Sequence, residues 1–216
     1  SLLLSGVPGT GKTMIGKLIA SKIRQTFIWV TADGFNRASN VRRIYQTARD
    51  NRPSVLFFED LDVVAGRDGA MSAVFGELLG QTDGLEPNDQ IITLATTNRP
   101  EALDEALKDR PGRFDRHIEI RPPSEPLRRR LFGNFMAQLH LECAPETMDL
   151  LVNRSAGSTG AHIRELVSAA TERGMVISIP MRVEDSRERS WLLNVPDVPL
   201  EEIVELVKMH PKARFL

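Results

Sequence analysis

The chain has 216 residues, of which 41% are hydrophobic and 26% are charged, a balance typical of a folded globular protein. Lys and Arg number 28 against 29 for Asp and Glu, so no positive excess indicates binding to nucleic acid or to an anionic membrane. A single cysteine, Cys143, excludes an internal disulfide and favours a reducing compartment, and no apolar stretch is long enough to span a bilayer, so we expect a cytoplasmic location.

Short apolar runs alternate with longer amphipathic segments over the first 121 residues. Runs that are apolar nearly throughout predict strands covered on both faces, whereas the amphipathic segments predict helices. Their alternation predicts an α/β fold, with a parallel sheet and helices on both of its faces. The predicted strands are 2–4, 27–30, 55–58, 91–95 and 118–120, and the predicted helices are 12–24, 40–51, 71–81 and 101–108.

A different pattern begins after residue 121. Two prolines, Pro122 and Pro123, end the last predicted strand, and helical segments then follow one another with no predicted strand between them. We therefore expect an α/β part over 1–121 and a mainly helical part over 122–216, with an irregular C-terminal tail. The predicted helices of the second part are 124–139, one beginning at 145, 161–172 and 200–209.

The segment between the first strand and the first helix fits the pattern G-x-x-x-x-G-K-S/T. Its glycines let successive amide groups curl around phosphates, and the following helix adds the positive end of its dipole. In this pattern the lysine reaches the β- and γ-phosphates of ATP and the threonine hydroxyl binds Mg²⁺. A chance glycine-rich turn is the alternative, which the flanking strand and helix disfavour. The predicted nucleotide-binding residues here are Gly6, Val7, Pro8, Gly9, Thr10, Gly11, Lys12, Thr13 and Met14.

Two carboxylates, Glu59 and Asp60, directly follow the apolar strand predicted over 55–58. In proteins with such a phosphate loop, an acid at a strand end binds Mg²⁺ and a neighbouring group orients the attacking water. Because parallel strands end at one edge of the sheet, the pair should lie beside the loop. Taken by itself the pair is also compatible with a solvated loop. The predicted metal-binding residues are Thr13, Glu59 and Asp60, and the two acids are also predicted to be catalytic.

With both motifs in place, the chain resembles an ATPase module of the AAA+ type, in the classical AAA group that contains membrane-bound AAA proteases and segregases. The resemblance covers about residues 1–175, with its motifs in the expected order. Four further stretches carry it: 78–85 before the fourth strand, 95–100 at the sensor-1 position, 103–116 at the arginine-finger position and 157–161 at the lid turn.

This resemblance implies a P-loop NTPase fold with a small helical lid, and a hexameric ring that binds Mg²⁺ and ATP at its interfaces. The part over 1–121 would be the nucleotide-binding subdomain without its N-terminal portion, and 122–216 the lid. Asn98 would position the attacking water, Ala161 would contact the nucleotide, and Arg113 and Arg116 would reach the neighbouring subunit's site. A surface salt-bridge cluster with Asp109 and Asp115 is the alternative for the two arginines.

The chain departs from the resembled family at several places. The order of Glu59 and Asp60 is the reverse of the usual one, so slow hydrolysis is expected. The segment 31–36 stands where a substrate-gripping loop is usual, but it lacks the aromatic–aliphatic–glycine order, so Phe35 either grips a polypeptide or packs. His162 and Arg164 are candidate nucleotide contacts, with an exposed helix start as the alternative.

Two functions remain open from the sequence. The first is an ATP-hydrolysing module that couples turnover to the remodelling or unfolding of protein substrates in a ring. The second is a nucleotide-regulated assembly or scaffold module with slow hydrolysis, which the reversed acids and the unusual loop favour. A GTPase fits less well because the chain has no N-K-x-D motif, and no H-E-x-x-H zinc-protease motif is present either.

Overall fold

A computed structural model of the chain describes residues 1–65, 70–83, 88–101, 103, 114 and 116–172. Arg113 and most of the helices predicted over 101–108 and 200–209 therefore lie outside the described residues. Contacts divide the described chain into two units. The first comprises Ser1–Val7 and Lys12–Ile120, and the second comprises Pro8–Gly11 together with residues 121–172.

Within the described part of the first unit, five parallel strands form one sheet in the order β2-β3-β4-β1-β5. The strands are β1 (Leu2–Ser5), β2 (Thr26–Val30), β3 (Ser54–Phe58), β4 (Ile91–Thr97) and β5 (Arg116–Glu119). This arrangement confirms the predicted parallel α/β fold, although β5 begins at Arg116 rather than at residue 118. Since β4 lies between β1 and β3, the carboxyl ends of these three strands adjoin.

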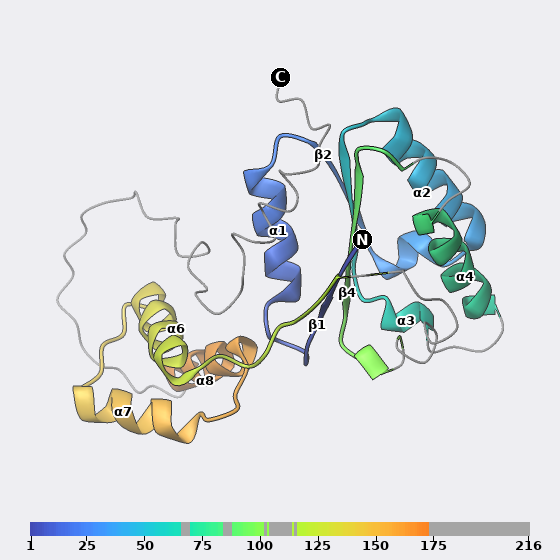
Figure 1. The fold of residues 1–216 in the computed structure, drawn as a ribbon. Helices are drawn as coiled ribbons and strands as arrows, with labels where there is room; N and C mark the ends of the chain where they lie inside the picture. The colour runs from blue at the N-terminus through green and yellow to red at the C-terminus, as the bar shows by residue number, and fades with distance from the viewer. Residues whose placement is uncertain (66–69, 84–87, 102, 104–113, 115, 173–216) are drawn as a thin grey trace. The chain divides into compact units, whose positions relative to one another are not determined.

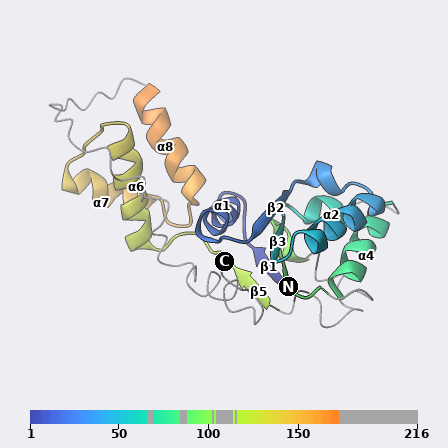
Figure 2. The ribbon, with the colours of Figure 1, turned by 90° about the horizontal axis from the view of Figure 1, so that it is seen from above.

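Helices cover both faces of the sheet (Figures 1 and 2). Helix α1 (Lys12–Lys22) lies on one face, and α2 (Ala38–Asp50) and α4 (Ala70–Asp83) lie on the other. Helix α1 approaches the sheet closely at Gly16, where a Cβ atom would lie 2.5 Å from Cζ of Phe57. The absence of a side chain at Gly16 therefore sets how near α1 comes to β3. The connections also form a short 3-10 helix, η1 (Ala32–Phe35), and helix α3 (Asp62–Ala65).

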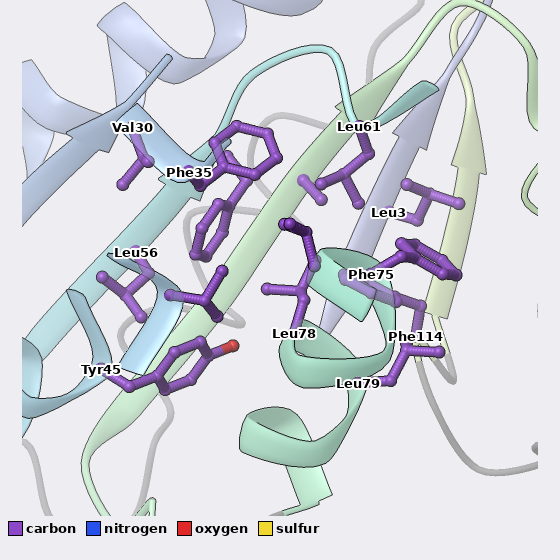
Figure 3. Packing of buried hydrophobic residues seen from close by; sticks show 14 of the residues in the cluster. Leu3, Val30, Phe35, Tyr45, Leu56, Leu61, Phe75, Leu78, Leu79 and Phe114 are labelled. Atoms are coloured by element: carbon purple, nitrogen blue, oxygen red, sulfur yellow. The ribbon is translucent and has the colours of Figure 1, made fainter. Parts of the chain in front are cut away.

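The α2 and α4 face of the sheet encloses the larger hydrophobic core (Figure 3). Phe35, Tyr45 and Phe58 are fully buried there. The ring of Phe35 meets that of Phe58 edge-on, with centroids 5.3 Å apart, and the Tyr45 hydroxyl is hydrogen-bonded to Thr93 Oγ1 at 3.0 Å. Of the two sequence interpretations of Phe35, the structure therefore supports packing, because a gripping residue must be exposed to its substrate.

Three helices form the second unit: α6 (Glu125–Gln138), α7 (Pro145–Arg154) and α8 (Gly160–Glu172). They pack around Phe132, Val152, Ile163 and Val167. Buried Arg128 joins the beginning of α6 to α7, because its guanidinium donates to the carbonyl oxygens of Pro123 at 3.2 Å and of Val152 at 3.1 Å. None of the helices described in either unit is long and apolar enough to cross a bilayer.

The burial of Phe35 generates a stability prediction. Phe35→Ala should lower the free energy of unfolding by about 3–5 kcal/mol, because it leaves a cavity against Phe58. Urea denaturation measures this loss. Val63→Ala serves as the control, since Val63 is 40% exposed and its truncation should change stability by no more than about 0.5 kcal/mol. If Phe35→Ala were as stable as the unmodified chain, the packing interpretation would be wrong and the gripping interpretation would be favoured.

Candidate functional site

The predicted phosphate loop connects β1 to α1. Its Gly9 and Gly11 have φ angles of +82° and +102°, which residues with a side chain rarely adopt. Lys12, at the first position of α1, is only 6% exposed. Its Nζ donates to the carbonyl oxygens of Gly6 at 2.6 Å and Val7 at 3.1 Å, so the ammonium lies within the curve of the loop. Burial lowers the pKa of Lys12, while Asp60 and Asp62 act in the opposite direction.

The remaining residues of the loop region are mostly exposed. Val7 is 48% and Met14 38% exposed, Pro8 and Gly9 are also exposed, and Thr10 is half-buried. Large apolar side chains at the surface beside a polar loop are available to contact a ligand.

Ala161 lies against the phosphate loop within the second unit. Its backbone N–H donates to the carbonyl oxygen of Gly9 at 3.2 Å. A Cβ atom at Gly9 would lie 2.7 Å from both Ala161 Cβ and Thr159 Oγ1, so only glycine fits at this point. The start of α8 thus supports the loop that the sequence analysis assigned to the nucleotide.

Glu59 lies directly after β3 and faces the first turn of α1. Thr13 Oγ1 donates to Glu59 Oε1 at 2.5 Å, and Trp29 Nε1 donates to Glu59 Oε2 at 3.1 Å. The structure therefore brings together two of the three residues predicted to bind Mg²⁺. A hydroxyl and a carboxylate are the hard oxygen ligands that Mg²⁺ prefers, so the pair fits this ion.

Protein side chains would supply only part of the coordination of such an ion. The described residues contain no group of three or more His, Cys, Asp or Glu side chains that could hold a metal. Mg²⁺ is usually bound through one or two carboxylates plus phosphates of the substrate and water. The pair Thr13 and Glu59 is therefore compatible with a metal that arrives with a nucleotide.

Asp60 is hydrogen-bonded to the neighbouring strand β4 and the residue after it. Its Oδ1 accepts a hydrogen bond from Asn98 Nδ2 at 3.0 Å, and its backbone N–H donates to Thr96 Oγ1 at 2.9 Å. The φ angle of Asp60 is +56°, a conformation that Asp tolerates better than most residues. The two adjacent acids thus have separate partners, Thr13 for Glu59 and Asn98 for Asp60.

Asp62 is a site residue that the sequence analysis did not identify. Its Oδ1 accepts hydrogen bonds from Thr97 Oγ1 at 3.0 Å and from the backbone N–H of Asn98 at 2.9 Å. These bonds fix the end of β4, from which the Asn98 side chain extends. A sequence signal did exist, because Asp62 follows the acidic pair closely and the carboxyl ends of parallel strands meet at one edge of the sheet.

Trp29, on β2, was also missed. It pairs in register with Phe57 on β3, two residues before Glu59. No sequence pattern predicts this contact, because an aromatic residue in a strand normally indicates packing. Its hydrogen bond to Glu59 forms because β2 is the strand that pairs with β3, and this pairing cannot be read from the sequence around Trp29.

Burial raises the pKa of Asp60, and the carboxylates of Asp62 and Glu59 raise it further. Lys12 and the hydrogen bond from Asn98 act in the opposite direction but do not cancel the increase. A carboxylate with a raised pKa is a stronger base, and its proton affinity lies closer to that needed for proton transfer near neutral pH. Asp60 is thus a stronger base than an unperturbed aspartate.

The other predicted residues are less well defined by contacts. Arg116 is the first residue of β5 and is exposed at an edge of the sheet, whereas Arg113 lies outside the described residues together with Asp109 and Asp115. The choice between arginine fingers and a salt-bridge cluster therefore stays a prediction. In the second unit, His162 and Arg164 are exposed in the first turns of α8.

Comparison with known proteins identifies the family of this chain. Residues 2–122 match the model of the ATPase family associated with various cellular activities (AAA). Over 187 residues the chain is 34% identical to the ATP-dependent zinc metalloprotease FtsH 1 of Rhodopirellula baltica, which covers 78% of this chain and 27% of that protein. It is 35% identical over 211 residues to the proteasome-activating nucleotidase of Methanothermobacter thermautotrophicus, with 91% and 49% covered.

A solved structure agrees with these matches. The AAA domain of FIGL-1, crystallised in complex with ADP, is similar with a TM-score of 0.68 and 29% identity, over 81% of this chain and 61% of that one. The chain spans about half or less of the length of the two curated relatives named above. Fold and family resemblance are thus confirmed.

The raised pKa of Asp60 generates a prediction about stability and pH. The native state binds this proton more tightly than the unfolded chain does, so stability falls as pH rises from 3.8, the ordinary value, through the raised pKa. Asp60→Asn removes this loss of stability, because asparagine has no proton to release. Asparagine also tolerates the positive φ angle and can still accept a hydrogen bond from Asn98. We therefore expect the variant to be more stable than the unmodified chain at neutral pH, with the advantage shrinking in acid.

Thermal unfolding across pH measures this difference. Asp50→Asn, at the exposed end of α2, is the matched control for the loss of one negative charge. A stability difference between Asp60→Asn and the unmodified chain that does not vary with pH would contradict the assignment.

Proposed function

Since the chain belongs to the AAA family of ATPases, we propose that it binds ATP with Mg²⁺ at the loop between β1 and α1 and hydrolyses it there. The observation that carries this proposal is the separation of the acidic pair. Glu59 is hydrogen-bonded to Thr13 beside the loop, while Asp60 is hydrogen-bonded to Asn98 at the end of β4. The two acids therefore have different tasks.

Phosphate binding rests on the loop and on the beginning of α1. Backbone amides of the loop and the positive end of the helix dipole favour the negative charge of a triphosphate. Lys12 adds a full charge, and its Nζ already lies among the loop carbonyls of Gly6 and Val7. Met14 and Val7 provide exposed apolar surface beside this charge. Ala161, next to Gly9, is proposed to contact the nucleotide from the lid.

Thr13 and Glu59 would hold the Mg²⁺ ion, since their oxygens lie together at 2.5 Å. When bound, Mg²⁺ neutralises charge on the phosphate oxygens. This assignment gives the metal-holding task to the longer acid of the pair. The third predicted metal ligand, Asp60, faces Asn98 instead, so we propose it as a catalytic residue without a direct place on the metal.

Asp60 is proposed to take the proton from the attacking water, and Asn98 to orient that water. The amide of Asn98 can both donate and accept without charge, and its Nδ2 donates to Asp60 at 3.0 Å. Asp62 keeps Asn98 in place through the backbone N–H of that residue. Asp60 has one methylene fewer than a glutamate at this position, so its carboxylate reaches less far. Slow hydrolysis therefore remains part of the proposal.

Assembly into a hexameric ring is proposed from the family. Arg116 is exposed at the sheet edge, where it is available to a neighbouring copy, and Arg113 precedes it closely in sequence. A guanidinium from a neighbour can stabilise charge on the transferred phosphoryl group. Residues 122–216 are proposed as the lid, and turnover in the ring is proposed to drive remodelling of a protein substrate. A cytoplasmic location remains a prediction.

A specific observation favours the second candidate function, a nucleotide-regulated assembly or scaffold module. The connection from β2 to α2, where a gripping loop is expected, exposes Thr31, Asp33, Gly34, Asn36 and Arg37. Its single aromatic residue, Phe35, is fully buried. A polar connection of this kind lacks the apolar surface that grips an unfolded polypeptide. The two functions separate on whether a protein substrate stimulates ATP turnover.

The catalytic assignment predicts the effect of Asp60→Asn on turnover. Asparagine cannot accept the proton, so kcat should fall by about 10²–10⁴-fold while ATP affinity stays near that of the unmodified chain. Steady-state phosphate release and equilibrium nucleotide binding measure the two quantities. Asp50→Asn controls for charge. Turnover retained in Asp60→Asn would show that another group activates the water.

The shared site predicts complementation between two inactive variants. Lys12→Ala should lose ATP binding but keep its arginines, whereas Arg113→Ala/Arg116→Ala should bind ATP but lose about 10³-fold or more in kcat. When the two variants are mixed, part of the ATPase activity should be recovered. The double arginine variant then binds the nucleotide, and a neighbouring Lys12→Ala subunit supplies the guanidinium. Sizing with and without ATP reports the ring directly. A mixture no more active than its components, or activity independent of assembly, would refute the shared site.

A further inference from the structure

Each carboxylate oxygen of Glu59 has its own donor. Thr13 Oγ1 donates to Oε1 at 2.5 Å, and the indole Nε1 of Trp29 donates to Oε2 at 3.1 Å. Both Trp29 and Glu59 are half-buried. An indole N–H can donate but cannot accept, so its bond holds the carboxylate in one orientation.

Two neighbouring rings, those of Phe57 and Phe27, restrict where the indole of Trp29 can lie. Its centroid is 4.6 Å from that of Phe57 and 6.0 Å from that of Phe27, and the rings of Phe27 and Phe57 are themselves 5.9 Å apart. Phe57 in turn packs under Gly16 of α1. The aromatic cluster of Phe27, Trp29 and Phe57 thus connects the position of the indole to the helix that carries Thr13.

We propose that Trp29 is a positioning residue for the proposed metal-holding carboxylate, which it keeps turned towards Thr13. This inference rests on the proposed function. It assigns to β2 a role in the site that neither the phosphate loop nor the acidic pair reveals. Trp29 contacts neither metal nor nucleotide in this role, because it acts through Glu59.

The physical reason lies in the length of Glu59. A glutamate side chain has more rotatable bonds than an aspartate, so its carboxylate can adopt more positions around the same backbone point. One hydrogen bond from Thr13 leaves the second oxygen able to swing away. The Trp29 bond removes that freedom and leaves Oε1 facing the hydroxyl. Groups that orient a metal ligand in this way commonly alter metal affinity or activity by about 10–100-fold.

The test compares nucleotide affinity with and without the metal. Calorimetry measures the Kd of a non-hydrolysable ATP analogue in Mg²⁺ and in EDTA, and their ratio is the gain in affinity from Mg²⁺. Trp29→Phe keeps an aromatic ring but removes the N–H. We expect it to reduce this gain by about 10-fold while leaving the affinity in EDTA unchanged.

Two further variants separate positioning from packing. Phe27→Leu disturbs the same aromatic cluster without touching the hydrogen bond, so it should lower thermal stability but keep the gain from Mg²⁺. In a Glu59→Asp background the shorter carboxylate is drawn back from the indole, so adding Trp29→Phe should have no further effect on the gain.

The outcomes distinguish this inference from the proposed function. Trp29 would act through packing alone if Phe27→Leu reduced the affinity gain from Mg²⁺ as much as Trp29→Phe does. The same conclusion would follow if Trp29→Phe still reduced this gain by the same factor in the Glu59→Asp background. An unchanged gain in Trp29→Phe would overturn the positioning role while leaving the metal assignment intact. If the unmodified chain bound the analogue no better in Mg²⁺ than in EDTA, the metal assignment itself would fail.

Discussion

The hydrogen bond from Thr13 Oγ1 to Glu59 Oε1 joins the first turn of α1 to the end of β3, and the rest of the site is arranged around it. The bond requires α1 to lie close to the sheet, which is possible because Gly16 presents no side chain to Phe57. The same helix position places Lys12 within the loop, because Lys12 and Thr13 are consecutive in its first turn. The close packing of Gly16 on the ring of Phe57 thus holds Lys12 and Thr13 near the carboxylate of Glu59.

The backbone after β3 explains how two adjacent acids obtain different surroundings. The N–H of Glu59 donates to the carbonyl oxygen of Val30 on β2, whereas the N–H of Asp60 donates to Thr96 Oγ1 on β4. With its positive φ angle, Asp60 turns the chain between these two bonds. Glu59 therefore faces the α1 side and Asp60 faces Asn98. In the proposed site, this geometry lets the two acids take different tasks although their order is reversed, since Glu59 meets Thr13 and Asp60 meets Asn98.

Much of this could be predicted from the sequence because it depends on local patterns. The phosphate loop has a fixed spacing, and the acidic pair stands at the end of an apolar run, so the prediction of a parallel sheet was enough to place both at one edge. Trp29 and Asp62 could not be assigned, because their roles depend on which side chains of neighbouring strands meet. The role of Phe35 was ambiguous for the same reason: only the packing of η1 against Phe58 shows that its ring is buried.

We propose that Glu59 holds the metal and that Asp60 activates the attacking water. A structure of the chain with Mg²⁺ and a non-hydrolysable ATP analogue tests it most directly. We expect the ion on the side of Thr13 and Glu59, with Asp60 and Asn98 facing the terminal phosphate. An ion on the side of Asp60, with Glu59 turned towards the terminal phosphate, would contradict the division of tasks between the two acids.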